Sequence, residues 1–383
     1  MKEREQSGRA SRSDLAERAD RIVGRAAARR YWPICAALTI VAASCNGLGR
    51  VPGDDHRLYA LKLFTPAASD GSADRFHQDI ALPLLARGLG ATSPHAFFFL
   101  CLAIVLGTLA ALAWRFRATL EPDAAVILFA LVVAHPVVTI LLSWIGEPDG
   151  ITFATTALVL LSGSPVAIGA AAAVGAANHT MAIVSLPIAL VIRWAGGERV
   201  SAAHALALLV GLIGGLILVG QFLAAQHLVA GSRLEFVRDI GFGYWIKQSL
   251  GSLPIMLWSL HGGVWFALIL SAWLMWETNR AYVLVQAAAM GVAFLAAIVS
   301  LDTTRVFALL AWAPAVHLVL TAWRRESEGT ARATLRRALV VAALVALTTP
   351  RLFVWEGAVV ASPFRNIPVR MFHLAAGRTV AGT

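Results

Sequence analysis

The sequence predicts an all-α protein: a polytopic helical bundle that lies in a membrane and crosses it about 11 times, partly through short or re-entrant helices. Two features of the composition predict this fold. Of the 383 residues, 58% are hydrophobic and only 14% are charged, whereas a soluble domain carries about 25% charged residues. The apolar residues also form runs of about 20, the length of helix that crosses the hydrocarbon core of a bilayer. A soluble α/β protein is excluded, because its buried strands would give shorter runs.

The distribution of arginine predicts the orientation of the chain. The formal net charge is +10, and the basic residues cluster at the ends of apolar runs, where positive charge is retained on the cytoplasmic side. We therefore expect a basic cytoplasmic tail in residues 1–30, a transmembrane domain in 31–356 and an outer tail in 357–383, in the inner (plasma) membrane of a bacterial-type cell. The expected partner is membrane lipid. Nucleic acid is excluded, since no long basic stripe is interleaved with aromatic residues.

The first crossing and the loop after it are the most distinctive part of the pattern. About thirty polar residues precede the apolar run from Tyr31 to Gly49, too many for a signal peptide, so we expect an uncleaved span. Residues 50–94 follow as a large outer loop, in which two amphipathic pieces suit helices that rest in the headgroup region. The later long crossings are expected at residues 96–114, 124–144, 202–225, 253–276 and 281–301. After a tight turn, a further crossing continues to Trp323, and the last is expected at 338–355.

Three shorter apolar pieces, residues 151–161, 166–177 and 180–194, lie between a predicted outer turn at Glu147 and a predicted cytoplasmic residue, Arg193. An odd number of crossings must separate the two sides. Either one long crossing carries a re-entrant pair, or three short helices each cross part of the bilayer. Irregular backbone at membrane depth survives only inside protein or along a wet cavity, so this region is predicted to form a cavity wall.

The sequence Gly53-Asp54-Asp55-His56 gathers ionisable groups just past the first crossing. Asp54 and Asp55 are the candidate catalytic carboxylates, because a carboxylate at a low-dielectric boundary can be tuned toward the neutral pKa that base catalysis needs. With His56 as a substrate-binding or ligand residue, the same group could hold a divalent cation. The alternative is a solvated loop whose acids pair with neighbouring arginines.

Four further residues are candidate substrate-binding groups. Arg305 can hold a phosphate in the bidentate manner of guanidinium, or it can pair with Asp302 at the start of the following helix. Glu147 and Asp149 flank a proline in a sharp turn, where a helix start also explains Asp149. His179 lies at a break between two apolar pieces, and ionisable residues at membrane depth are functional candidates. His135, His261 and His317 also lie in or near spans, where packing explains them. Gly211 and Gly215 have the spacing of close helix packing.

The layout resembles the GT-C class of membrane glycosyltransferases: a first span, a large outer loop with acids and interfacial helices, and many further spans, several of them short. The resemblance implies a sugar donor carried on a polyprenyl phosphate, an acceptor activated by Asp54 or Asp55, and Arg305 as a phosphate contact. The alternative is a transporter or flippase whose binding cavity is formed by the broken helices 145–180. No nucleotide-binding or hydrolase motif is present. The sequence leaves open whether the protein is an enzyme, whether it uses a metal, and its oligomeric state.

Overall fold

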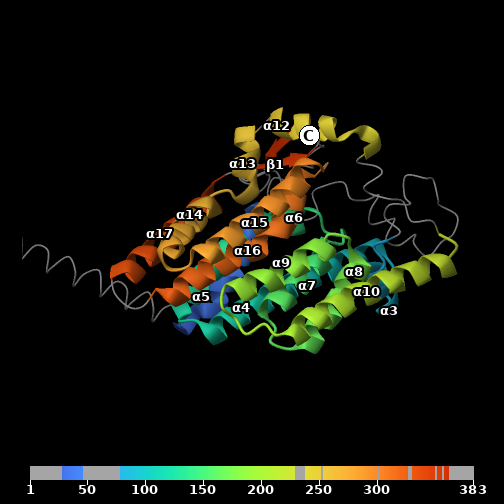
Figure 1. The fold of residues 1–383 in the computed structure, drawn as a ribbon, viewed down its shortest axis with the longest axis horizontal. Coiled ribbons are helices and arrows are strands. Elements are labelled where there is room, and N and C mark those ends of the chain that lie inside the picture. Colours follow the sequence, from blue (N-terminus) through green and yellow to red (C-terminus); the bar gives the residue numbers. More distant parts are fainter. Residues whose placement is uncertain are drawn as a thin grey trace, which may run out of the picture.

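The computed structural model describes residues 28–45, 78–228, 238–251, 253–300, 302–326, 330–349, 352–355 and 358–361, and these are almost entirely helical (Figure 1). The all-α prediction is confirmed. Residues 28–45 form the first helix. The others are α3 (Ala81–Gly88), α4 (Pro94–Thr119), α5 (Pro122–Ala134), α6 (Pro136–Ser143), α7 (Asp149–Leu161), α8 (Pro165–Asn178), α9 (Ala182–Ala195), α10 (Ala202–Ala225), α12 (Phe242–Gly251), α13 (Leu253–His261), α14 (Val264–Thr278), α15 (Arg280–Ile298), α16 (Thr303–Arg325) and α17 (Thr330–Thr348). One short antiparallel hairpin follows them, β1 (Leu352–Trp355) with β2 (Ala358–Ala361).

Several of these helices are long and apolar enough to cross a membrane, as a multi-pass membrane protein requires. Within the described residues, α4, α10, α15 and α16 each meet that condition alone. Two further candidates are bent pairs: α5 with α6, at 55°, and α13 with α14, at 76°. The described helices thus offer four to six spans, so the predicted count of about 11 is not confirmed.

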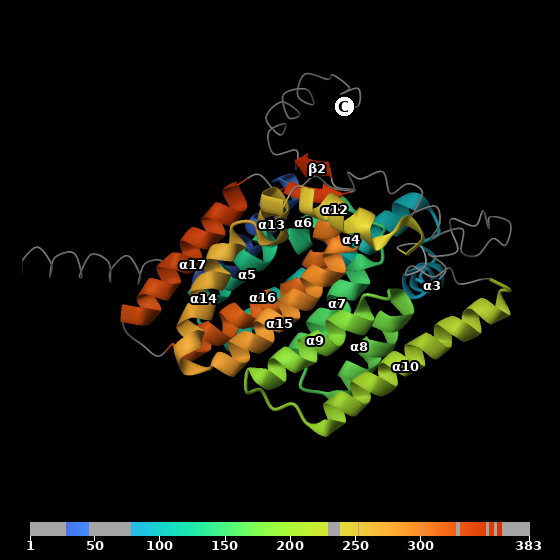
Figure 2. The same ribbon diagram turned by 45° about the horizontal axis from the view of Figure 1, so that its top comes forward.

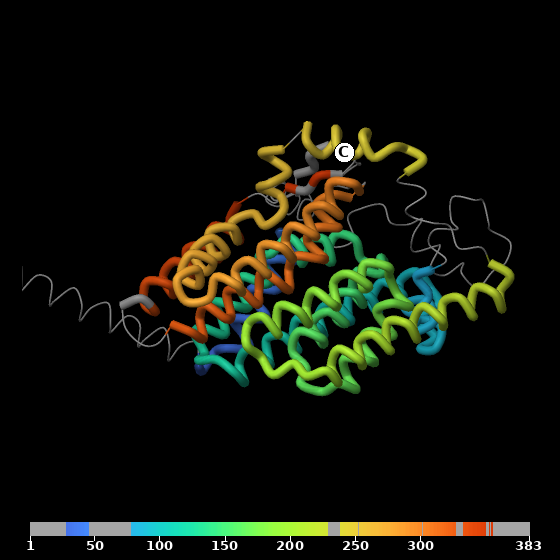
Figure 3. Tube along the Cα trace, in the orientation of Figure 1, coloured from blue at the N-terminus to red at the C-terminus, as the bar shows by residue number. Residues whose placement is uncertain are grey.

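The three short apolar pieces form three antiparallel helices, α7, α8 and α9, side by side with α10 (Figure 2). At one end, the Asn178 Nδ2 donates to the Pro148 carbonyl at 2.7 Å. At the other end, His204 Nε2 lies 3.1 Å from the Gly163 carbonyl oxygen. The helices have 13, 14 and 14 residues, about 20 Å each, which is less than the ~30 Å of a hydrocarbon core. Figure 3 follows the path of these three short helices; how they cross the bilayer, as a re-entrant pair or as three partial crossings, stays a prediction.

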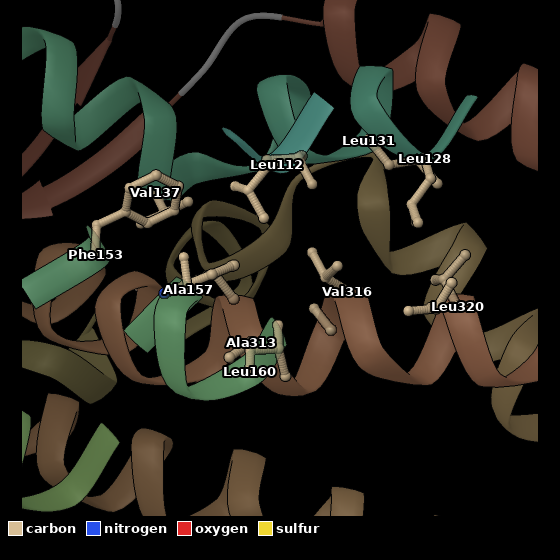
Figure 4. Packing of buried hydrophobic residues seen from close by; sticks show 14 of the residues in the cluster. Leu112, Leu128, Leu131, Val137, Phe153, Ala157, Leu160, Ala313, Val316 and Leu320 are labelled. Atoms are coloured by element: carbon tan, nitrogen blue, oxygen red, sulfur yellow. The ribbon is translucent and has the colours of Figure 1, made fainter. Parts of the chain in front are cut away.

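Helix α16 forms the centre of the bundle. Nearly all of its residues are buried, including both of the segments that flank Pro314. Its Ala313, Val316 and Leu320 lie in one hydrophobic core with Ala157 and Leu160 of α7 (Figure 4). Between apolar helices in lipid, such close packing supplies much of the attraction. The first turn of α16, with Thr303 and Thr304 buried, is therefore fixed within the bundle.

Small residues bring α8 and α10 into close contact, as the spacing of Gly211 and Gly215 predicts. A Cβ atom on Gly211 would clash with the carbonyl oxygen of Gly169, and one on Gly215 with that of Ala173. Only glycine allows the two backbones to approach so closely.

Three predicted spans differ from the structure. The run 124–144 is broken at His135, because Pro136 lacks an N–H and disfavours helical backbone in the residue before it. The run 253–276 is broken at Gly262, whose φ is 55°. The last helix, predicted at 338–355, begins at Thr330 and ends at Thr348.

The last helix therefore includes residues 330–337, which lie before the predicted span. Arg332 pairs with Glu121 at 2.9 Å, and Arg336 pairs with Asp123 at 2.9 Å. These ion pairs hold its charged first turns against the start of α5. The helix ends just before Pro350, as helices generally do before a proline.

Candidate functional site

The turn before α7 carries two of the predicted site residues, Glu147 and Asp149. Gly146 opens the turn with a φ of 114°, a conformation that glycine adopts without strain. Asp149 begins α7, where the partial positive charge of the helix N-terminus stabilises a carboxylate. The turn therefore presents both carboxylates at the same end of the bundle.

Arg305, in the first turn of α16, binds both of these carboxylates and a third. Its Nε donates to Asp149 Oδ2 at 2.7 Å, and its NH2 nitrogen donates to Asp149 Oδ1 at 3.2 Å and to Glu147 Oε2 at 2.8 Å. Its NH1 nitrogen donates to Asp302 Oδ2 at 3.1 Å. Three of the residues singled out from the sequence, Glu147, Asp149 and Arg305, thus meet in one place with Asp302. We call these four residues the Arg305 cluster.

The Arg305 cluster is largely withdrawn from solvent. The side chains of Asp149 and Glu147 are 1% and 5% exposed, that of Arg305 is 13% and that of Asp302 is 19%. One guanidinium binds all three carboxylates. Buried charges are stable only when paired and hydrogen-bonded, so these contacts stabilise three acids at one end of the bundle.

The predicted ion pair between Asp302 and Arg305 is present, but Asp302 makes no side-chain cap to α16. The phosphate contact of Arg305 stays a prediction. Four hydrogen bonds to carboxylates leave one of the five guanidinium N–H donors unused, so a phosphate bound through two N–H groups would have to displace one of the acids. Asp302 is the most exposed of the three.

Asn178 ties the break between α8 and α9 to the turn that carries Glu147 and Asp149. Its side chain is fully buried and donates to the Pro148 carbonyl at 2.7 Å and to Thr152 Oγ1 at 3.3 Å. Its Oδ1 has no hydrogen-bond partner among the described residues. His179, the next residue, is also buried, and its Nδ1 accepts from the Met181 amide at 3.2 Å, which shapes the start of α9.

The large polar loop joins the described structure at the same end. Its last residues before α3 are fixed by a hydrogen bond from the Ile80 amide to the Ala177 carbonyl, at 3.0 Å. Ala177 directly precedes Asn178. The predicted catalytic residues Asp54 and Asp55, and His56 beside them, lie outside the described residues.

No metal site is evident in the described part of the chain, where no three His, Cys, Asp or Glu side chains are placed to hold an ion. In the Arg305 cluster, the guanidinium stands where a metal would have to bind. The proposed divalent cation thus concerns the segment with Asp54, Asp55 and His56 and stays a prediction.

A second polar group, missed in the sequence analysis, lies at the opposite end of α16. Glu198, in the turn between α9 and α10, accepts from Arg193 Nε at 2.8 Å and from His317 Nε2 at 3.3 Å. His317 Nδ1 accepts in turn from the Tyr282 hydroxyl at 2.8 Å. Burial alone would raise the pKa of the Glu198 carboxyl, but the bonds from His317 and Arg193 outweigh it and lower that pKa to about 2. The sequence feature that could have indicated this group is Glu198 itself, an acidic residue that follows two glycines and precedes an arginine at the end of an apolar run.

Comparison with protein-family models, with curated proteins and with solved structures finds no match to this chain.

Proposed function

We propose that this protein is a membrane-embedded transferase that moves a sugar from a polyprenyl-phosphate carrier, with its centre at the outer face beside the Arg305 cluster. One observation carries the proposal. The bond between Ile80 and Ala177 fastens the loop that bears Asp54 and Asp55 to the end of the bundle where Arg305 gathers three carboxylates.

The charge distribution supports an outer position for the Arg305 cluster. The end of the bundle around Glu198 holds most of the arginines at helix ends, and positive residues are retained on the cytoplasmic side. They are Arg117 at the end of α4, Arg193 at the end of α9, and Arg324 and Arg325 at the end of α16. A plasma membrane with this end inside leaves the Arg305 cluster outside.

In the proposed reaction, an acceptor hydroxyl oxygen attacks the anomeric carbon of the donor sugar. The bond from that carbon to the phosphate oxygen breaks, and its electron pair leaves with the polyprenyl phosphate. Asp54 or Asp55 takes the proton of the hydroxyl, as a general base. Glu147, held by Arg305, positions the polar groups of the sugar, and the donor phosphate reaches Arg305 by displacing Asp302.

A second candidate function is a transporter or flippase, favoured by two features of the segment 145–180. Helices α7 to α9 are about 20 Å long. A polar headgroup that moves along them would therefore cross a thinner apolar layer than the full hydrocarbon core. Asn178 Oδ1 also lies buried at a helix break without a hydrogen-bond partner among the described residues, as a substrate-binding acceptor would.

Sugar transfer and lipid translocation by one preparation of the full chain in proteoliposomes separate the two functions. A labelled short-chain prenyl-phosphate sugar serves as the donor. The transferase predicts transfer that is lost in both Asp54→Asn and Asp55→Asn, or in one of them, and kept in Asn178→Ala at reduced rate. The transporter predicts translocation without transfer, lost in Asn178→Ala and kept in both Asp variants. Full transfer by both Asp variants would contradict the proposed base.

A further inference from the structure

A small hollow opens at the Glu198 end of the bundle, where α4, α7 and α16 meet. Its cavity volume is about 30 Å³. The polar side chains that line it include Arg115 and Thr119 from the end of α4, Glu198, and Arg324 from the end of α16. Two arginines from different helices thus converge on one opening.

Apolar side chains form the rest of the wall. Leu160 and Leu161, from the last turn of α7, and Leu320, from α16, line the hollow below the arginines. A site with cationic groups at its rim and leucines at its wall suits a molecule with an anionic head and an apolar tail.

The two rim arginines are available for a ligand. Arg115 is exposed and makes no ion pair within the described residues. Arg324 is 43% exposed, and its one ion pair there is the long contact of 3.6 Å to Glu198 Oε1. Glu198 itself is already neutralised by Arg193 at 2.8 Å. The hollow therefore has two cationic side chains in excess.

The hollow lies at the depth of lipid headgroups. Trp114, next to Arg115, is 62% exposed, and Trp194, at the same end of α9, is 64% exposed. Exposed tryptophans gather at the boundary between hydrocarbon and headgroups. Basic pockets between helices at this level bind the headgroups of anionic lipids.

We propose that this hollow is a binding site for one anionic phospholipid, whose phosphate is held at the rim by Arg115 and Arg324 and whose acyl chain leaves past Leu161, the partly exposed leucine of the wall. Arginine binds phosphate through paired N–H donors. Because the rim residues come from α4 and α16, the bound lipid would join the two helices at this end. The site is independent of the transferase proposed at the Arg305 cluster.

Native mass spectrometry of the full-length protein in detergent, titrated with a phosphatidylglycerol, tests the site. We expect the first bound lipid to lose at least about tenfold in affinity in the double variant Arg115→Gln/Arg324→Gln, about 1.4 kcal/mol or more. The matched control is Arg117→Gln/Arg325→Gln, which removes the same charge from the same two helix ends without touching the hollow. In that control, the affinity for the first bound lipid should stay within about twofold of that of the unaltered protein.

Three outcomes would overturn the proposal. Equal losses in both double variants would show that binding follows the overall charge, and no loss in either would show that Arg115 and Arg324 do not hold the lipid. Displacement of the lipid by about 1 mM inorganic phosphate would show a site for free phosphate instead. A phosphatidylcholine, which carries the same phosphate without net charge, should bind more weakly to the unaltered protein. Arg115, Arg324 and Arg325 are exposed, where Arg→Gln changes cost about 0.5 kcal/mol or less, and Arg117 loses a contact over the Tyr31 ring worth about 0.5–1 kcal/mol, so both variants should fold.

Discussion

Arg305 and Asp149 are separated by 156 positions in the chain, yet the guanidinium Nε donates to the Asp149 Oδ2 at 2.7 Å. This pair joins the start of α16, the central helix, to the start of α7, the first of the short helices. Glu147 and Asp302 complete the cluster on the same guanidinium. The charged groups of two distant segments are therefore fixed together at one end of the bundle.

The Arg305 cluster should contribute strongly to stability. Arg305→Gln leaves three carboxylates without their buried cation, a change that typically costs about 3–5 kcal/mol. Unfolding by SDS from mild detergent measures this loss. Arg238→Gln is the control, since its ion pair with Asp239 is 65% and 68% exposed and should be worth about 1 kcal/mol or less. Equal effects of the two variants would contradict a structural role for the cluster.

Because α8 packs closely on α10, alanine substitutions at two nearby glycines of α10 should change stability in opposite directions. Gly211→Ala places a methyl group against the Gly169 carbonyl oxygen and should lower the unfolding free energy by about 1–3 kcal/mol. Gly214→Ala, in the same helix, meets no atom within 4 Å and should raise that free energy by about 0.5–1 kcal/mol through helix propensity. If Gly211→Ala were also stabilising, the interface of these helices would have to be looser.

The pairing of Glu198 should make stability depend on acidity. Its pKa is lowered from 4.5 to about 2 in the folded protein, so its contribution is fully present above pH 4.5 and is lost as the pH falls through about 2. Its partial exposure limits the contribution to about 1–3 kcal/mol. The difference between the melting temperatures of the wild type and Glu198→Gln, compared from about pH 7 down to about pH 3, should become smaller toward the acid end. A constant difference between them would contradict this linkage.

The breaks in two bent spans meet at a pair of histidines. His135 Nε2 lies 2.9 Å from His261 Nδ1, and His135 Nδ1 accepts from the Val137 amide at 3.1 Å. The hydrogen bonds thus assign the proton of neutral His135 to Nε2, which donates to His261. His135→Phe should cost about 1–3 kcal/mol, because His261 loses its donor in a buried site.

The double variant His135→Phe/His261→Phe checks this reading of the pair. Once both partners are apolar, no buried acceptor is left unsatisfied, so part of the lost stability should return. Additive losses in SDS unfolding would mean that the two rings do not depend on each other.

Composition and run length were enough to predict the helical fold and its apolar spans, since both depend on the solvent that the side chains meet. The spacing of Gly211 and Gly215 predicted the contact that they make, because that pattern lies within one helix. The break at His135 was missed because hydropathy runs unbroken through Pro136. Here, backbone chemistry rather than polarity ends the helix.

The candidate site was only partly predictable. Asp302 and Arg305 are three positions apart, so their ion pair could be expected from local geometry alone. Asp149 and Glu147 come from a segment far away in the chain, and no periodicity shows which distant arginine they meet. The same holds for Glu198, which contacts His317 across 119 positions.

Sugar transfer by Glu147→Gln in proteoliposomes tests most directly whether the Arg305 cluster is a functional centre. Glutamine keeps the size of the side chain and removes its charge. The proposed function predicts a loss of transfer rate of about 100-fold in a protein that still unfolds cooperatively in SDS. Full transfer by Glu147→Gln, and likewise by Asp302→Asn, would contradict it and leave the cluster a purely structural one.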